Sequence, residues 1–157
     1  MREILFISCI LAVTVYLAVT AWEDYKTCEV TRWKHLVGGV PALLYFFLNC
    51  NRYSIEENIA VIFFAVLYMV VGCAGIYGFA DGLVLGILTL FFGSVGGLWG
   101  SGTVVLIMVI AAFSFLSCHV VNGVVKRKKI FVNMAGALIP HICVGYVVVL
   151  LIVALYV

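Results

Sequence analysis

Long apolar runs separated by short polar stretches follow one another along the whole chain. Each approaches the roughly 20 residues that an α-helix needs to cross the hydrocarbon core of a bilayer. The pattern predicts an all-α, polytopic membrane bundle of about six transmembrane helices, forming a single membrane-embedded domain over residues 1–157. The expected spans are Ile4–Trp22, Leu36–Cys50, Ile55–Ala74, Gly82–Leu98, Thr103–Val121 and Val132–Val157.

Two stretches depart from this regular pattern. Leu36–Cys50 is short and contains Pro41, so we expect it to be tilted, half-inserted or packed inside the bundle. The glycine-rich segment Gly93–Gly102 predicts a flexible outer loop. Trp99 within it suits the interface between membrane and water.

Composition supports a membrane protein and argues against other classes. Hydrophobic residues make up 66% of the chain and charged residues 10%, whereas soluble domains carry roughly 25% charged residues. The net charge of +2 gives no indication of a nucleic-acid partner, so lipids and other membrane helices are the expected partners. The six cysteines are scattered without a C-x-x-C pair, which indicates no metal or redox site. The oligomeric state stays open.

The distribution of basic residues predicts the orientation. If the N-terminus lies outside, only Arg2 and Arg52 remain on the outer side, and the cytoplasmic loops hold Lys26, Arg32, Lys34, Lys126, Arg127, Lys128 and Lys129. Such a bias is typical of multi-pass proteins of the cytoplasmic membrane. Cleavage of the first run as a signal peptide would weaken the bias, so we interpret that run as a membrane helix.

One carboxylate stands alone between apolar runs. No Lys or Arg lies between Arg52 and Lys126, so nothing cationic nearby in sequence neutralises Asp81. A carboxylate at membrane depth is costly and usually marks function. The predicted topology also places Asp24, at the end of the first span, at the same cytoplasmic face as Asp81 at the start of the fourth.

Two carboxylates at one depth can share a proton, because like charges a few ångströms apart cannot both ionise easily. The ionised member can then activate a water while the protonated member hydrogen-bonds a scissile carbonyl. This chemistry requires no metal and no other cofactor. The positions of the two aspartates leave two other roles open, capping of helix N-termini and cation binding.

The segments around both aspartates are similar to known motifs. Residues 24–30, Asp-Tyr-Lys-Thr-Cys-Glu-Val, resemble the first catalytic motif of the type IV prepilin peptidases. Residues 78–81, Gly-Phe-Ala-Asp, resemble the second, the Gly-x-Gly-Asp motif shared with other intramembrane aspartic proteases. The resemblance implies that Asp24 and Asp81 are catalytic and that Gly78, Ala80 and Lys26 support them.

Members of this family cleave the short basic leader of prepilin-like proteins at the cytoplasmic face, just before an apolar helix. The chain differs from the usual motifs at three places: Ala80 replaces a glycine, Gly82 stands where many members are basic, and Thr31-Arg32 replaces Pro-Asn. It lacks the cytoplasmic insertion with paired C-x-x-C motifs of larger members. The resemblance therefore implies peptidase activity without methyltransferase activity.

Two other function classes fit parts of the pattern. One is a non-catalytic membrane scaffold of a pilus or secretion system. The other is a small transporter with Asp81 as its ion site, which would favour more polar residues in the spans and repeat symmetry between halves. The isolated histidines His35, His119 and His141 give no metal-ligand spacing, so we expect packed or interfacial side chains there.

Overall fold

The computed structural model describes residues 2–126 and 137–156. These parts of the chain are helical and contain no strand, which confirms the all-α class. A short 3-10 turn, η1 (Cys50–Arg52), follows the second helix. The helices are α1 (Arg2–Thr27), α2 (Lys34–Asn49), α3 (Ile55–Cys73), α4 (Phe79–Lys126) and α5 (Ile139–Tyr156).

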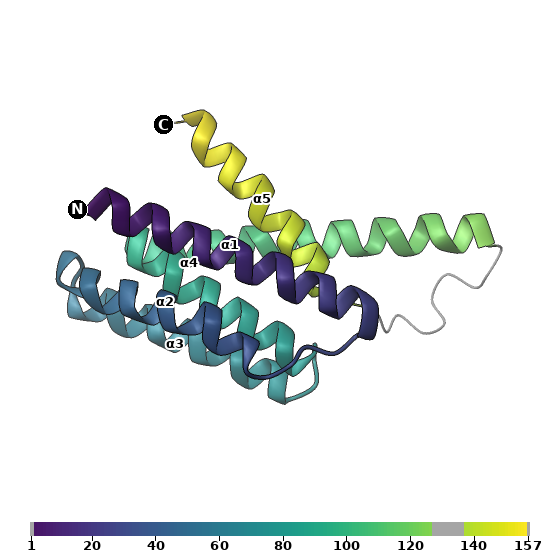
Figure 1. The fold of residues 1–157 in the computed structure, drawn as a ribbon, viewed down its shortest axis with the longest axis horizontal. Helices are drawn as coiled ribbons and strands as arrows, with labels where there is room; N and C mark the ends of the chain where they lie inside the picture. Colours follow the sequence, from purple (N-terminus) through teal and green to yellow (C-terminus); the bar gives the residue numbers. More distant parts are fainter. Residues whose placement is uncertain (1, 127–136, 157) are drawn as a thin grey trace.

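The helices run back and forth, so the chain reverses at two opposite ends of the bundle (Figure 1). The loop end carries residues 28–33 and 74–78, and the turn end carries η1 and a kink within α4. Between the ends, apolar side chains of all the helices form the core, with Leu17, Leu85 and Tyr146 among the fully buried ones. Segments far apart in the sequence thus meet at the loop end.

The described residues form five helices rather than the six expected, because the fourth and fifth expected spans are joined within α4 without a loop, across a break of the helix at Gly96 and Gly97. Three of the helices in residues 2–126 and 137–156 are long and apolar enough to cross a membrane, over Ile4–Thr27, Ile55–Cys73 and Phe79–Val121. The helix α2 has 16 residues, and the apolar part of α5, Ile139–Val153, is also shorter. The expected sixth span begins in residues 127–136, which lie outside the described chain, as do Arg127, Lys128 and Lys129.

The expected outer loop at Gly93–Gly102 is also corrected. Only Gly96 and Gly97 have non-helical backbone angles in this stretch, and Gly97 has a φ of +58°, which glycine adopts without strain. A Cβ added at Gly100 would collide with the carbonyl group of Phe92. A straight helix would hold these two residues about 12 Å apart, so the chain folds back sharply and two glycines replace the loop.

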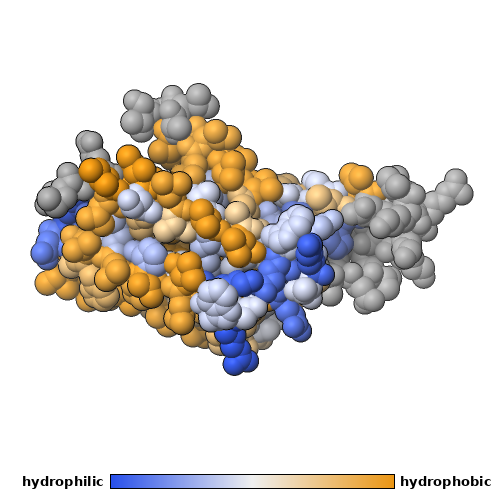
Figure 2. All heavy atoms as spheres, in the orientation of Figure 1, coloured by the Kyte–Doolittle hydropathy of each residue, from blue (hydrophilic) through white to orange (hydrophobic). Residues whose placement is uncertain are grey.

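The surface is that of a membrane protein in its overall pattern. Many large apolar side chains are exposed on α1 to α5, and on the visible face they cover the middle of the bundle while hydrophilic residues gather mainly at the loop end (Figure 2). Apolar area exposed on this scale is unfavourable in water. Lipid contact along the helices removes that cost.

Two polar pairs between helices hold the elements that carry the loop end. The hydroxyl of Tyr16 on α1 lies 2.7 Å from Nδ1 of His35 at the start of α2, and its ring packs where Gly38 has no side chain. Burial lowers the pKa of His35, partly offset by the charge of Glu23. A second pair, Thr14 and Tyr146 at 3.0 Å, joins α1 to α5. These contacts set where α1 ends relative to α2 and α5.

Candidate active site

Asp24 lies near the end of α1 and joins it to the start of α5. Its side chain is 6% exposed, and Oδ2 accepts a 3.0 Å hydrogen bond from the backbone N–H of Ile139, the first residue of α5. The N–H groups of a first helical turn have no partner within the helix. Asp24 therefore supplies that partner across 115 positions of sequence.

Asp81 lies in the first turn of α4 and is 8% exposed. Its Oδ2 accepts a 3.0 Å hydrogen bond from the backbone N–H of Gly78, three residues earlier. This backward reach resembles one half of a capping box. A Cβ added at Gly78 would lie 2.8 Å from the same Oδ2. The missing side chain of Gly78 thus leaves the space that the carboxylate occupies.

The second carboxylate oxygen of each aspartate remains available. No described hydrogen bond involves Oδ1 of Asp24 or of Asp81, whose bonds run through Oδ2. No fully buried side-chain oxygen or nitrogen among the described residues lacks a partner, so both Oδ1 atoms reach accessible space. Each carboxylate is therefore held by one oxygen and open at the other.

Asp24 and Asp81 line one open cavity of about 600 Å³ at the loop end. This volume falls in the range of small-ligand sites, about 300–1,000 Å³. The cavity brings together four of the residues expected from the motifs: Asp24, Asp81, Gly78 and Ala80. Its other lining residues are Cys28, Glu29, Val30, Arg32, Phe79 and Leu138.

Lys26, the fifth expected residue, does not line this cavity. Its Nζ lies 4.4 Å from the ring centroid of Trp22, at a cation–π distance. Residues two positions apart on a helix point to different sides, so Lys26 and Asp24 cannot share a face of α1. The described basic residue that lines the cavity is instead Arg32.

Sequence reasoning took Glu29 as a solvated loop residue that could touch a basic leader, and it missed that Arg32 and Leu138 line the cavity. Arg32 carried a usable signal, because it follows the first motif and departs from the Pro-Asn that the family often has there. Leu138 carried none, since it lies over a hundred positions from Asp24 in sequence. The three histidines each have a hydrogen-bonding neighbour, with His141 Nδ1 2.8 Å from the Ser114 hydroxyl.

The candidate site is thus a pair of carboxylates from separate helices that open onto one cavity. Within residues 2–126 and 137–156, no three His, Cys, Asp or Glu side chains gather as a metal-ligand group. The chain matches no protein-family model, no curated protein and no solved structure. The site is therefore interpreted from its geometry and from the two motif segments.

Proposed function

We propose that this protein is a membrane-embedded aspartic endopeptidase that removes the short basic leader of prepilin-like proteins at the cytoplasmic face. The observation that carries the proposal is the opening of the Asp24 and Asp81 carboxylates onto one cavity from two different helices. The resemblance of both segments to prepilin peptidase motifs supports the same reaction class.

In the proposed reaction the two carboxyl groups share one proton, because like charges in one cavity disfavour double ionisation. The ionised carboxylate takes a proton from a water, whose oxygen attacks the scissile carbonyl carbon. The protonated carboxyl donates a hydrogen bond to the carbonyl oxygen. The tetrahedral intermediate then releases the amine, which receives a proton from a carboxyl group. Backbone bonds from Ile139 and Gly78 hold the two groups in place.

The surroundings of the cavity favour a basic leader followed by an apolar helix. Asp24, Asp81 and Glu29 contribute three carboxyl groups to the lining, against one guanidinium from Arg32 among the described residues. An acidic lining attracts a cationic peptide. Lys26 in the last turn of α1, Arg32 in the following loop and Lys34 at the start of α2 all belong to the loop end, which favours a cytoplasmic location for the cavity.

A second candidate is a non-catalytic membrane scaffold, and one observation favours it. Asp24 and Asp81 each accept a backbone N–H at the start of a helix, which is what a purely structural carboxylate does. In that case removal of their ionisation would leave function unchanged as long as the hydrogen bonds persist.

Asparagine substitutions separate the two candidates, because an amide oxygen still accepts the backbone N–H but the side chain cannot ionise. The wild type, Asp24→Asn, Asp81→Asn and the control Glu56→Gln would each be co-expressed with a prepilin-like protein, and leader removal followed as a mobility shift. Glu56 is exposed in the first turn of α3, at the turn end.

If the protein is a peptidase, wild type and Glu56→Gln should remove the leader, and both asparagine variants should fail to remove it. The asparagine variants should keep normal melting temperatures in detergent. Processing that survives both asparagine substitutions would contradict the catalytic pair. Inserted, stable wild-type protein that processes no prepilin-like substrate would favour the scaffold.

A further inference from the structure

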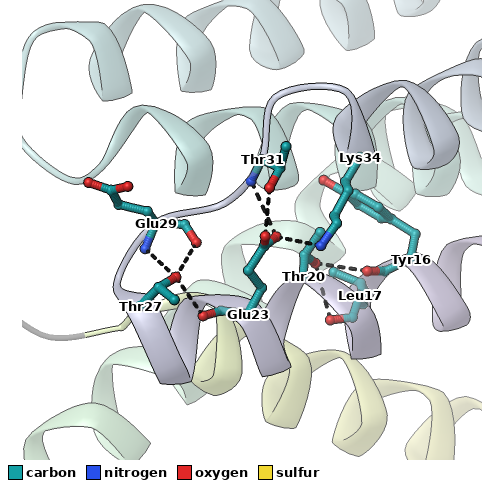
Figure 3. Close-up of polar contacts among 8 residues, drawn as sticks. All are labelled: Tyr16, Leu17, Thr20, Glu23, Thr27, Glu29, Thr31 and Lys34. Atoms are coloured by element: carbon teal, nitrogen blue, oxygen red, sulfur yellow. Dashed lines mark hydrogen bonds and ion pairs between the residues drawn. The ribbon is translucent and has the colours of Figure 1, made fainter.

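The last turns of α1 hold the α1–α2 loop, residues 28–33, through one carboxylate (Figure 3). Glu23 accepts the backbone N–H of Thr31 at 3.2 Å through Oε2 and the Thr31 hydroxyl at 2.6 Å through Oε1. Its Oε2 also pairs at 2.9 Å with Nζ of Lys34, the first residue of α2. Glu23 therefore fixes the loop and holds the Lys34 ammonium beside α1.

The side chains of Glu23 and Asp24 line two different pockets. The two residues are neighbours on α1, so their side chains leave the helix about 100° apart. Asp24 lines the loop-end cavity, whereas Glu23 and Lys34 line a second open pocket of about 420 Å³, which we call the interfacial pocket. The other residues of the interfacial pocket form one stripe of α1: Ala18, Val19, Trp22, Lys26 and Thr27.

The lining of the interfacial pocket changes from apolar to cationic along α1. Ala18 and Val19 are exposed in the apolar part of the helix, and Lys26 follows Ala18 by about 12 Å towards the loop end. Trp22 between them is 63% exposed, and Lys26 Nζ lies 4.4 Å from its ring centroid. Exposed tryptophan and lysine side chains are typical of the interface between membrane and water. The pocket therefore spans the boundary between lipid tails and headgroups.

The charge of the interfacial pocket is opposite to that of the loop-end cavity. Lys26 and Lys34 contribute two positive charges to its lining and Glu23 one negative charge, which leaves a net charge of +1. An ammonium group has three N–H donors, so the ion pair with Glu23 leaves donors on Lys34 for a second anion. A ligand with an apolar tail and a negative head complements both parts of this pocket.

We propose that the interfacial pocket binds an anionic phospholipid, with the phosphate between Lys26 and Lys34 and an acyl chain along Ala18 and Val19. The bound phosphate bridges the end of α1 and the start of α2, the same two elements that Glu23 joins. The lipid site is separate from the loop-end cavity and does not depend on the proposed peptidase activity.

Lipid binding to the purified full chain in detergent, followed by native mass spectrometry, tests the site. The probes are phosphatidylglycerol and phosphatidylcholine of equal chain length. Both lipids carry a phosphate, but only phosphatidylglycerol has a net negative charge. One basic residue near a membrane surface contributes about fivefold to the affinity for an anionic lipid.

Lys26→Gln should therefore weaken the binding of phosphatidylglycerol about fivefold and leave that of phosphatidylcholine unchanged. Arg52→Gln is the matched control, because it removes one charge from an exposed arginine of η1 at the turn end. It should change neither affinity. Equal losses in Lys26→Gln and Arg52→Gln would indicate a general effect of net charge and would overturn the site.

Glu23→Gln should have the opposite effect. The amide keeps an acceptor for Thr31 but loses the negative charge, so the net charge of the lining rises and phosphatidylglycerol should bind about fivefold tighter. A general loss of structure would not strengthen lipid binding. Unchanged or weaker binding of phosphatidylglycerol would contradict the charge balance on which the site rests.

Ala18→Phe tests whether the ligand is a lipid or a free phosphate. Ala18 is exposed in the apolar part of the pocket, so a phenyl ring there should block the acyl chain and weaken the binding of both lipids. Ala112→Phe is the matched control, because it places the same ring at an exposed alanine of α4. Displacement of phosphatidylglycerol by inorganic phosphate, without an effect of Ala18→Phe, would overturn the lipid assignment in favour of free phosphate.

Discussion

At both ends of the bundle, carboxylates accept backbone N–H groups at the start of a helix, but the surroundings of these carboxylates differ. At the turn end, Ser54 and Glu57 form a complete capping box at the start of α3. The Tyr53 hydroxyl donates to the carbonyl oxygen of Val95, and the Asn58 amide donates to that of Cys50 at 2.7 Å. Polar groups at this end therefore satisfy one another.

At the loop end, Asp24 and Asp81 also accept backbone N–H groups at helix starts, but both side chains line one cavity of about 600 Å³. A capping bond alone therefore does not separate a structural carboxylate from a chemical one. Under the proposed function, the distinction comes from the cavity that the two aspartates line together.

The largest expected effect comes from replacing one capping carboxylate at each end of the bundle by its amide. Asp81→Asn should lower leader cleavage by about 10²–10⁴-fold, the usual contribution of an acid–base group, because the amide cannot ionise. Glu57→Gln at the turn end keeps an acceptor for the Ser54 N–H and should leave cleavage unchanged. Initial rates in detergent or in vesicles measure both, and equal losses would refute the functional difference between the ends.

Gly78→Ala is the next largest expected effect. The added Cβ would lie 2.8 Å from Oδ2 of Asp81, so that carboxylate must shift. A small displacement of a reacting group lowers the rate by up to about 10²-fold. Cleavage rates should fall while the melting temperature changes little. A fall in stability that matches the fall in rate would show instead that Gly78 serves folding.

Gly100→Ala tests the turn end, where the effect should be on stability. Its Cβ would collide with the Phe92 carbonyl group, and such overpacking typically costs about 1–3 kcal/mol. Gly102→Ala is the matched control, because nothing lies within 4 Å of a Cβ built there. Thermal unfolding in detergent measures both variants. Equal stability of the two would contradict the sharp reversal at Gly96 and Gly97.

The smallest expected effect is a pH dependence at His35. Because burial lowers its pKa, the folded protein favours the neutral imidazole. Its contribution to stability is therefore present above the ordinary pKa of about 6.5 and is lost as the pH falls through the lower pKa of the folded state. Melting temperatures of wild type should drop between pH 7 and pH 5, and the drop should be smaller in His35→Gln. If the melting temperature of His35→Gln drops as much as that of wild type, groups other than His35 cause the pH dependence.

The sequence alone determined the helical class and the candidate pair. Apolar runs of membrane length allow only helices or closed barrels, and their lengths here favour helices. Because the chain crosses from end to end, the end of the first run and the start of the fourth had to meet on one side. This is why Asp24 and Asp81 could be paired before the fold was known, and the structure places both on one cavity.

Only the tertiary structure decided the number of helices and the partners around the pair. Gly96 and Gly97 turn α4 without a loop, and Gly100 lets the chain pass close to the Phe92 carbonyl group. Composition cannot distinguish such a turn from a flexible segment. The choice of Arg32 over Lys26 for the cavity follows from the path of the loop that Glu23 and Thr31 fix. The hydrogen bond from Ile139 to Asp24 joins the start of α5 to the end of α1. Such contacts depend on how segments far apart in the sequence pack together, and the local pattern of apolar and polar residues does not predict this.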